Sequence, residues 1–266
     1  KDFNKKMIFK EQVMKIFNLK GKVALVTGSS QGIGLALAEG LAEAGAEIIL
    51  NGRNKKKLYN AANHLKKNYE TISVLQFDVT DHSIVKEKIN EHFESGKRID
   101  ILVNNAGMQY RAPLEDFPLE QFELLMKTNV SSIFNVGQAV AKHMIKDGKG
   151  KIINIASVQT ALARPGIAPY TTTKGAVSNL TKGMATDWAP KGLQVNAIAP
   201  GYFNTPLNAA LVADPDFTTW LEKRTPAGRW GEVKELIGVC IFLAAPSSSF
   251  VNGQTIFVDG GITASL

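Results

Sequence analysis

The chain has 266 residues, of which 44% are hydrophobic and 21% charged, a composition that excludes wholesale disorder and fibrous repeats. The formal charge of +7 comes partly from short lysine clusters without interleaved aromatic residues, which argues against nucleic-acid binding and favours a solvated surface around a site that uses anions. One cysteine excludes an intramolecular disulfide framework, and no apolar run reaches the roughly 18 residues of a membrane span.

Residues 1–20 contain lysines but neither the apolar core nor the cleavage site of a secretory signal. We therefore expect a cytoplasmic protein in which this segment forms an appended arm or helix. Residues 21–266 are expected to fold as one domain, because α/β domains often reach this length.

Short runs rich in Val and Ile recur along the chain, as expected for strands buried on both faces of a sheet. They are Val23–Val26, Ile48–Leu50, Ile72–Phe77, Ile99–Val103, Ile152–Ile155, Val195–Ile198 and Thr255–Val258. Amphipathic helical stretches lie between them at residues 33–44, Ser83–Glu94, Gln121–Lys146, Thr173–Ala189 and Val233–Ala245. This alternation predicts an α/β fold: one doubly wound, Rossmann-type domain with a seven-stranded parallel sheet, helices on both faces and right-handed connections.

The stretch from residue 201 to residue 231 interrupts this alternation. It contains Pro206, Pro215 and Pro226 and follows the carboxyl end of a strand, which is where open α/β sheets bind ligands. We interpret it as a lid over a substrate site, with an ordinary surface connection as the alternative.

Glycines cluster between the first strand and the first helix, in the sequence Thr27-Gly-Ser-Ser-Gln-Gly-Ile-Gly34. Glycine permits a tight turn and a close approach of the backbone to a pyrophosphate, and the helix amino terminus offers unpaired N–H groups and a positive dipole end. At the start of a β-α-β unit this turn predicts dinucleotide binding. The cofactor-binding residues expected here are Gly28, Ser30, Gln31, Gly32, Ile33 and Gly34.

Tyr170 and Lys174 are four residues apart, which places them on one face of a helix. A tyrosine ordinarily titrates near ~10, but a lysine ammonium and an oxidised nicotinamide ring both favour its phenolate form. Tyr170 can then exchange a proton with a substrate alcohol or carbonyl oxygen, to which Ser157 can also hydrogen-bond. The alternative is an exposed helical pair without a catalytic role.

The GxxxGxG spacing of the glycine turn, the later Asn104-Asn-Ala-Gly107, Ser157 and the Tyr170–Lys174 pair together resemble the short-chain dehydrogenase/reductase family. The resemblance covers residues 19–266 and implies a nicotinamide-dependent oxidoreductase that forms a homotetramer. It also implies that Asn129 completes a catalytic tetrad by ordering a water that reaches Lys174. The further cofactor contacts that it implies are Asp78, Val79, Asn105, Ala106, Gly107, Tyr170, Lys174, Pro200, Gly201 and Thr205; for Asp78 and Thr205 a capping or turn role is the alternative.

Three stretches resemble one group within that family, the gluconate 5-dehydrogenases. They are residues 162–170, 183–188 and 225–231. The implied reaction is the reversible interconversion of D-gluconate and 5-keto-D-gluconate, a small sugar-acid substrate. The 2-deoxygluconate 3-dehydrogenases and the 3-oxoacyl carrier-protein reductases stay open as alternatives, as does a non-catalytic NADP-binding regulator.

The choice between NAD and NADP depends on the end of the second strand, Leu50–Asn54. An NAD site would place an acid there to hold the ribose hydroxyls, and none is present. Arg53 offers a planar fork to a 2′-phosphate instead. The sequence departs from many NADP-dependent members at Gln31, where they have a basic residue, so Arg53 is expected to act largely alone. We predict NADP, with a solvated surface arginine as the alternative.

An anionic substrate requires a cation or several hydrogen-bond donors. Arg111 and Arg164 are the expected carboxylate ligands, and Gln159, Ser157 and Tyr170 the other substrate contacts; surface or interface ion pairs are the alternative for the two arginines. No metal site is expected, because the four histidines are scattered at spacings unlike those of ligands. Cys240 is expected in the core.

Overall fold

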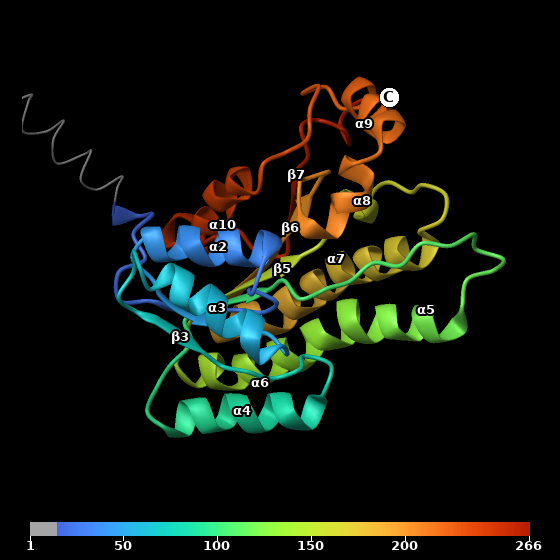
Figure 1. The fold of residues 1–266 in the computed structure, drawn as a ribbon. Helices are drawn as coiled ribbons and strands as arrows, with labels where there is room; N and C mark the ends of the chain where they lie inside the picture. The colour runs from blue at the N-terminus through green and yellow to red at the C-terminus, as the bar shows by residue number, and fades with distance from the viewer. Residues whose placement is uncertain (1–14) are drawn as a thin grey trace, which may run out of the picture.

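The computed structural model describes residues 15–266, so the predicted arm over residues 1–20 lies mostly outside the described residues. Seven parallel strands form one sheet in the order β3-β2-β1-β4-β5-β6-β7, which confirms the predicted doubly wound architecture (Figure 1). The strands are β1 (Val23–Val26), β2 (Glu47–Leu50), β3 (Ile72–Val74), β4 (Ile101–Asn104), β5 (Gly150–Ile155), β6 (Leu193–Pro200) and β7 (Thr255–Val258).

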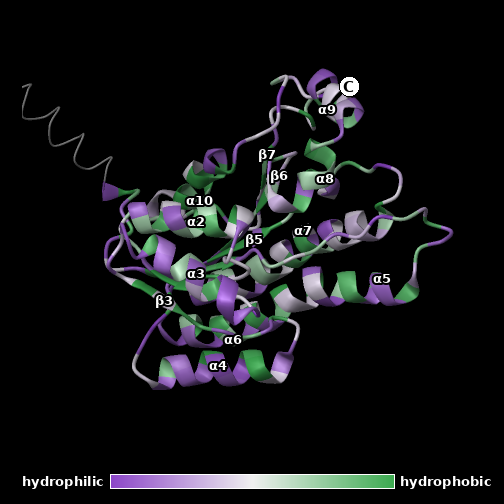
Figure 2. Ribbon diagram, viewed as in Figure 1, coloured by the Kyte–Doolittle hydropathy of each residue, from purple (hydrophilic) through white to green (hydrophobic). Residues whose placement is uncertain are grey.

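Helices cover both faces of the sheet. On one face α2 (Gly32–Glu43), α3 (Lys55–Leu65) and α10 (Ile237–Ala244) pack on a hydrophobic core. On the other, α4 (His82–Glu94), α6 (Ser132–Lys146) and α7 (Ala168–Trp188) pack on a second core, with α5 (Leu119–Met126) leading into α6. Figure 2 shows the hydrophobic residues concentrated on the strands and the hydrophilic residues on outer helices such as α4. Within the described residues, no helix is long and apolar enough to cross a membrane.

The last crossover departs from the predicted uniform handedness. The steps from β5 to β6 and from β6 to β7 run in the same direction along the sheet, yet α7 covers one face and α10 the other, beside α2. The β6–β7 connection therefore has the opposite hand to the β5–β6 connection. The handedness rule holds for short crossovers that pack straight back onto the sheet, whereas here the long segment 201–231 precedes α10.

Three further differences concern the helices. The predicted helix over Gln121–Lys146 is continuous but contains a π-helical segment, η1 (Lys127–Ser131), in which the Ser132 N–H donates to the Lys127 carbonyl. The helix that carries Tyr170 starts at Ala168, earlier than predicted. The helix α3 was not predicted, although its buried residues Leu58, Ala61, Ala62 and Leu65 have the spacing of an amphipathic helix.

The segment that precedes α10 folds over the carboxyl end of the sheet. It contains α8 (Ala209–Val212) and α9 (Pro215–Arg224). Its underside forms a small third core around Leu221 and Ile262, in which Phe217 and Trp230 also pack. Its residues Pro206, Leu207 and Leu211 line the cavity described next.

Candidate active site

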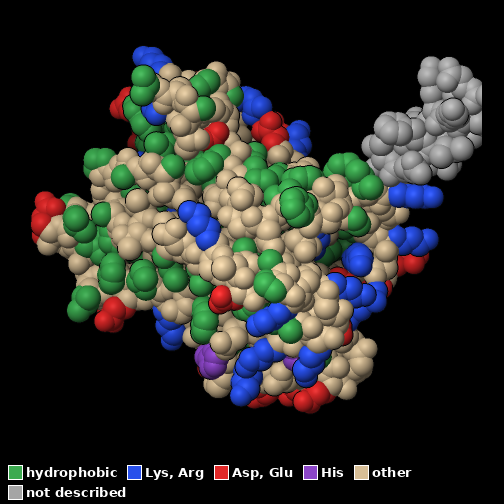
Figure 3. Space-filling view, turned by 180° about the vertical axis from the view of Figure 1, so that it is seen from behind, with side chains coloured by type: hydrophobic (Ala, Val, Ile, Leu, Met, Phe, Trp, Pro, Cys, Tyr) green, Lys and Arg blue, Asp and Glu red, His purple; other side chains and the backbone are tan. Residues whose placement is uncertain are grey.

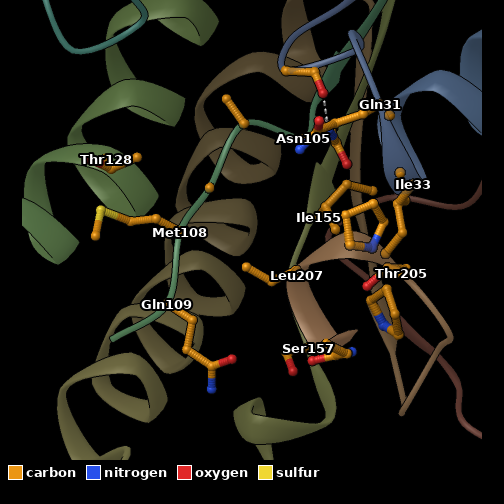
Figure 4. Close-up of a pocket in the computed structure, with 18 of the residues that line it drawn as sticks. Gln31, Ile33, Asn105, Met108, Gln109, Thr128, Ile155, Ser157, Thr205 and Leu207 are labelled. Atoms are coloured by element: carbon orange, nitrogen blue, oxygen red, sulfur yellow. Dashed lines mark hydrogen bonds between the residues drawn. The ribbon is translucent and has the colours of Figure 1, made fainter. Parts of the chain in front are cut away.

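A cavity of about 660 Å³ opens at the carboxyl end of the sheet. Figure 4 shows Gln31 and Ile33 from the start of α2, Asn105 and Met108 from the segment after β4, and Ser157 from the segment after β5 around it. Every predicted catalytic, cofactor and substrate residue lines this cavity except Asn129. Side chains from six separate stretches of sequence therefore meet at one place, as the carboxyl ends of parallel strands should.

The glycine turn packs closely against the segment that follows β4. Gly28 has a φ of +61°, and a Cβ there would lie 2.8 Å from the Cα of Ala106. A Cβ at Gly34 would collide with the Asn105 amide. The side chain of Gln31 does not cap α2, and the first turn of that helix has no acidic residue. Unused N–H groups and an uncompensated dipole end suit the pyrophosphate of a dinucleotide, so the residues present fit the cofactor.

Hydrogen bonds hold this turn against the neighbouring strand ends. The Thr27 hydroxyl accepts from the backbone N–H groups of Asn105 and Ala106 at 3.0 and 3.1 Å. The Asn105 amide donates to the carbonyls of Thr27 and Gly28. The buried Ser29 hydroxyl accepts from the backbone N–H of Asn51 at the end of β2. The cavity wall is therefore rigid, which preorganises it for a ligand.

Lys174 extends from the buried face of α7. Its side chain is 6% exposed, and its Nζ donates to the Ile155 carbonyl at 2.7 Å and lies 5.6 Å from the centre of the Tyr170 ring. Burial lowers the pKa of Lys174 to about 8, because desolvation disfavours the charged form. Lys174 is therefore buried, whereas Tyr170 is half-buried.

Tyr170 faces opposing influences. Burial raises the pKa of its phenol to about 12, while the Ser157 hydroxyl and the Arg111 guanidinium act in the opposite direction. Ser157 lies immediately after β5, is 8% exposed and accepts from the backbone N–H of Gln159. A phenol, a hydroxyl and an ammonium around one cavity are the groups that proton exchange with a substrate oxygen requires.

Asn129 lies behind the cavity, within the π-helical segment η1. Its side chain is 1% exposed. The amide accepts from the backbone N–H of Met108 and donates to the carbonyl of the same residue, at 2.8 and 2.9 Å; it also donates to the Thr173 hydroxyl at 3.1 Å. It thereby ties the segment after β4 to α7, one residue before Lys174. π-helical segments are frequent at functional sites.

The far end of the cavity is formed by the β2–α3 junction. Arg53 is 79% exposed along its side chain, and its Nη1 lies 3.9 Å from a carboxylate oxygen of Asp78. The other carboxylate oxygen of Asp78 accepts from the backbone and the hydroxyl of Thr80, so a turn role and a place in the cavity coexist in one residue. Thr205 lines the cavity, and its side chain makes no cap for the helical turn that it precedes.

Two guanidinium groups converge at the opposite end. Burial and the neighbouring Arg164 guanidinium lower the pKa of Arg111. Arg164 lies 5.1 Å from the Phe217 ring centre, and its Nε is buried without a hydrogen-bond partner among the described residues. Neither arginine forms an ion pair with another residue of the range 15–266. Two cations held together without an acid form a site suited to an anion.

Several polar side chains that the sequence did not assign to the site also line the cavity, among them Lys57 and Tyr202. Lys57 belongs to the unpredicted helix α3. Tyr202 directly follows the predicted Pro200 and Gly201, and its position after a strand end was the signal that would have identified it.

In the part of the chain that the structure describes, no three His, Cys, Asp or Glu side chains could hold a metal ion. Cys240 is buried in the core.

Comparison with known proteins defines the class. A family model described as enoyl-(acyl carrier protein) reductase matches residues 28–263, and the chain belongs to the short-chain dehydrogenase/reductase family. It is 59% identical to the gluconate 5-dehydrogenase of Gluconobacter oxydans (strain 621H), over 94% of this chain and 98% of that protein.

Two further relatives agree. The 5-keto-D-gluconate 5-reductase of Escherichia coli (strain K12) is 46% identical, over 93% of this chain and 97% of that protein. The crystal structure of a gluconate 5-dehydrogenase from Burkholderia cenocepacia J2315, in complex with NADP and tartrate, superposes with a TM-score of 0.93 at 55% identity, over 96% of this chain and 100% of that chain.

Proposed function

We propose that the protein is an NADP-dependent oxidoreductase that interconverts D-gluconate and 5-keto-D-gluconate. This proposal rests on one cavity in which three features meet: the glycine turn, the Tyr170–Lys174–Ser157 group and two arginines without an ion pair among residues 15–266. Relatives that are 59% and 46% identical over nearly the whole chain are a gluconate 5-dehydrogenase and a 5-keto-D-gluconate 5-reductase.

The proposed mechanism assigns the proton to Tyr170. When bound, the nicotinamide supplies the hydride acceptor or donor. In oxidation, the Tyr170 phenolate takes the proton of the substrate alcohol; in reduction, the phenol returns it to the carbonyl oxygen. Ser157 hydrogen-bonds the same substrate oxygen, and Lys174 supplies positive charge beside the ring. Asn129 holds the surrounding segments in place.

The cofactor is proposed to lie between the two ends of the cavity. Gly28, Gly34 and the amino terminus of α2 would hold the pyrophosphate, while Asp78, Val79 and Thr205 would contact the remainder. Arg53 would bind the 2′-phosphate. Lys57 lines the same end of the cavity. It would supply the second positive charge beside the 2′-phosphate, which the neutral Gln31 does not supply. A related gluconate 5-dehydrogenase crystallised with NADP supports this assignment.

The substrate carboxylate is proposed to bind Arg111 and Arg164. A planar guanidinium can grip a carboxylate with two parallel hydrogen bonds, and the pair has no competing acid among residues 15–266. The same neighbour that contains NADP also contains tartrate, a hydroxylated dicarboxylate, which supports a site for sugar acids rather than for neutral polyols.

A substrate panel tests the proposal. The purified protein would be assayed with NADP⁺ and NAD⁺ on D-gluconate, 2-deoxygluconate and neutral polyols, and with NADPH and NADH on 5-keto-D-gluconate and a 3-oxoacyl thioester. We expect the highest kcat/KM for gluconate and 5-keto-D-gluconate with the phosphorylated cofactor, and NMR of the product should place the carbonyl at C5. Preference for the thioester would contradict the substrate, and cofactor binding without turnover on any compound would indicate a regulator.

We further propose a cytoplasmic homotetramer. One buried cysteine fits a reducing compartment. Exposed hydrophobic side chains gather on α5 and α6, among them Leu119, Phe122, Leu124 and Phe134, and Figure 3 shows hydrophobic side chains on the end of the molecule that carries α5. Apolar groups exposed together favour an interface. Light scattering after gel filtration would give the mass of four chains; the mass of a monomer would contradict it.

A further inference from the structure

Gln159 is a buried polar side chain with half of its amide unused. It lies two residues after Ser157 and is 5% exposed. Its Nε2 donates to the Tyr202 hydroxyl at 3.4 Å, whereas its Oε1 is buried and has no hydrogen-bond partner among the described residues. A buried acceptor without a donor destabilises the folded protein by about 1–3 kcal/mol. Because Gln159 lines the cavity, a ligand donor can remove this cost.

Tyr202 offers the complementary group. It lines the same cavity, and its ring is fixed by edge-on contacts with Trp220 and Trp230 and by a tilted contact with Phe217. Its oxygen accepts from Gln159, which leaves the Tyr202 proton available for a ligand. Burial raises the pKa of Tyr202, so the group remains a donor at neutral pH.

An acceptor and a donor held side by side match an alcohol, which donates one hydrogen bond and accepts another. A carboxylate would face the Gln159 carbonyl oxygen, and a methylene would leave both protein groups unpaired. Resting on the proposed function, we infer that Gln159 and Tyr202 together bind a hydroxyl of the sugar-acid chain other than the reacting one. They thereby select hydroxylated substrates over deoxygenated ones.

The charges around the pair agree with this role. Tyr202 feels both the Arg164 and the Arg111 guanidinium groups, so the pair lies beside the site proposed for the carboxylate. It also lies near Tyr170, whose pKa Tyr202 raises. A substrate held at two points, by its carboxylate and by one hydroxyl, has a more closely fixed orientation toward Tyr170 than a substrate held at one point.

The test compares substrates that differ by one oxygen atom. The kcat/KM for 5-keto-D-gluconate would be divided by that for each of its singly deoxygenated analogues, with the wild type, Gln159→Met and Tyr202→Phe. We expect the wild type to discriminate against one analogue by about 10- to 100-fold, the scale of leaving a buried group unpaired. Both variants should bring that one ratio close to 1 and leave the ratios for the other analogues unchanged.

A matched control is Gln194→Met, the same change at a glutamine outside the cavity whose amide donates to the Gly192 carbonyl. It should keep every wild-type ratio. Tyr202→Phe removes a single oxygen atom, so it can be used for the same comparison if Gln159→Met does not fold. Unchanged ratios in the folded variants would overturn the inference and leave the proposed function standing. Absence of turnover on any sugar acid by the wild type would overturn the proposed function and this inference with it.

Discussion

Tyr170 is the residue at which burial and charge oppose each other most directly. Its pKa is raised to about 12 by burial and lowered in part by Ser157 and Arg111. The pKa of the neighbouring Lys174 is shifted to about 8 by the same burial. A catalytic proton carrier works best when its pKa lies near the working pH, so the bound cofactor and substrate are expected to complete the adjustment.

Tyr170→Phe tests the assigned proton transfer. The ring is retained and the transferable proton is lost, so we expect turnover to fall by about 10²–10⁴-fold while the cofactor still binds. Steady-state kinetics and calorimetric titration with NADP measure the two effects. Loss of a general acid is expected to lower kcat to less than roughly a tenth of the wild-type value. If the variant keeps more than that, Tyr170 is not the proton carrier.

Arg111→Ala tests the carboxylate site. We expect the KM for gluconate to rise while NADP affinity stays nearly unchanged, because the guanidinium lies at the substrate end of the cavity. The pH profile of oxidation should also move to higher pH, since the Arg111 charge lowers the pKa of Tyr170. Kinetics between pH 7 and 10 measure both. Unchanged gluconate kinetics would contradict the assignment and weaken the sugar-acid substrate itself.

At the scale of elements, the β2–α3 junction shows an arrangement that helix stability alone does not explain. The first turn of α3 contains Lys55, Lys56 and Lys57 and no acid, although the positive end of a helix dipole favours negative charge. Asn54 caps the helix by accepting from the Lys57 backbone N–H. An anion bound at Arg53 and Lys57 would turn this unfavourable cluster into a favourable one.

Arg53→Ala is therefore expected to weaken NADP binding by about 1.5–3 kcal/mol, the scale of a hydrogen bond to a charged group, and to leave NAD binding nearly unchanged. Lys57→Ala should act in the same direction with a smaller loss. Lys56→Ala is the control, because Lys56 does not line the cavity. Calorimetric titration with both cofactors separates the cases; equal loss for NAD and NADP would make Arg53 structural.

The elements were largely predictable, for a physical reason. Strands buried on both faces must be apolar throughout, so runs such as Ile152–Ile155 identified all seven strands. The helix α3 was missed although its buried residues have the spacing of an amphipathic helix. The η1 segment was missed because apolar residues alone do not distinguish a π-helical turn from an α-helical one. Among the site residues, Tyr202 was missed although it follows the end of β6; its hydrogen bond from Gln159 could be seen only in the structure.

At the scale of the whole molecule, the buried Lys174 and the half-buried Lys151 link stability to pH. Lys151, at the opposite end of β5 from the cavity, donates to the Ser248 hydroxyl at 3.1 Å, and burial lowers its pKa to about 8. Lys174 has a similarly lowered pKa. Between pH about 8 and the ordinary value of 10.5, the unfolded chain binds more protons than the folded one. Each lysine therefore makes stability rise with pH across that window and destabilises the fold below it.

Lys151→Met tests this linkage without touching the site. Relative to the wild type, the variant should be most favoured near pH 7, and its advantage should shrink as the pH rises toward 10. Urea unfolding of both proteins at pH 7, 8, 9 and 10 measures the difference. A difference in free energy of unfolding that does not change with pH would show that Lys151 stays protonated in both states.

The π-helical segment η1 also lets one additional residue fit between two helices that share one axis. Its hydrogen bond closes over five residues instead of four, so the turn takes up that residue without rotating α5 against α6. Deleting one residue within 127–131 would restore regular hydrogen bonding and keep the exposed apolar side chains of α5 on the same side. Asn129 would lose the widened turn from which it reaches Met108 and Thr173 together. The deletion would therefore change the wall of the cavity and spare the surface proposed for assembly.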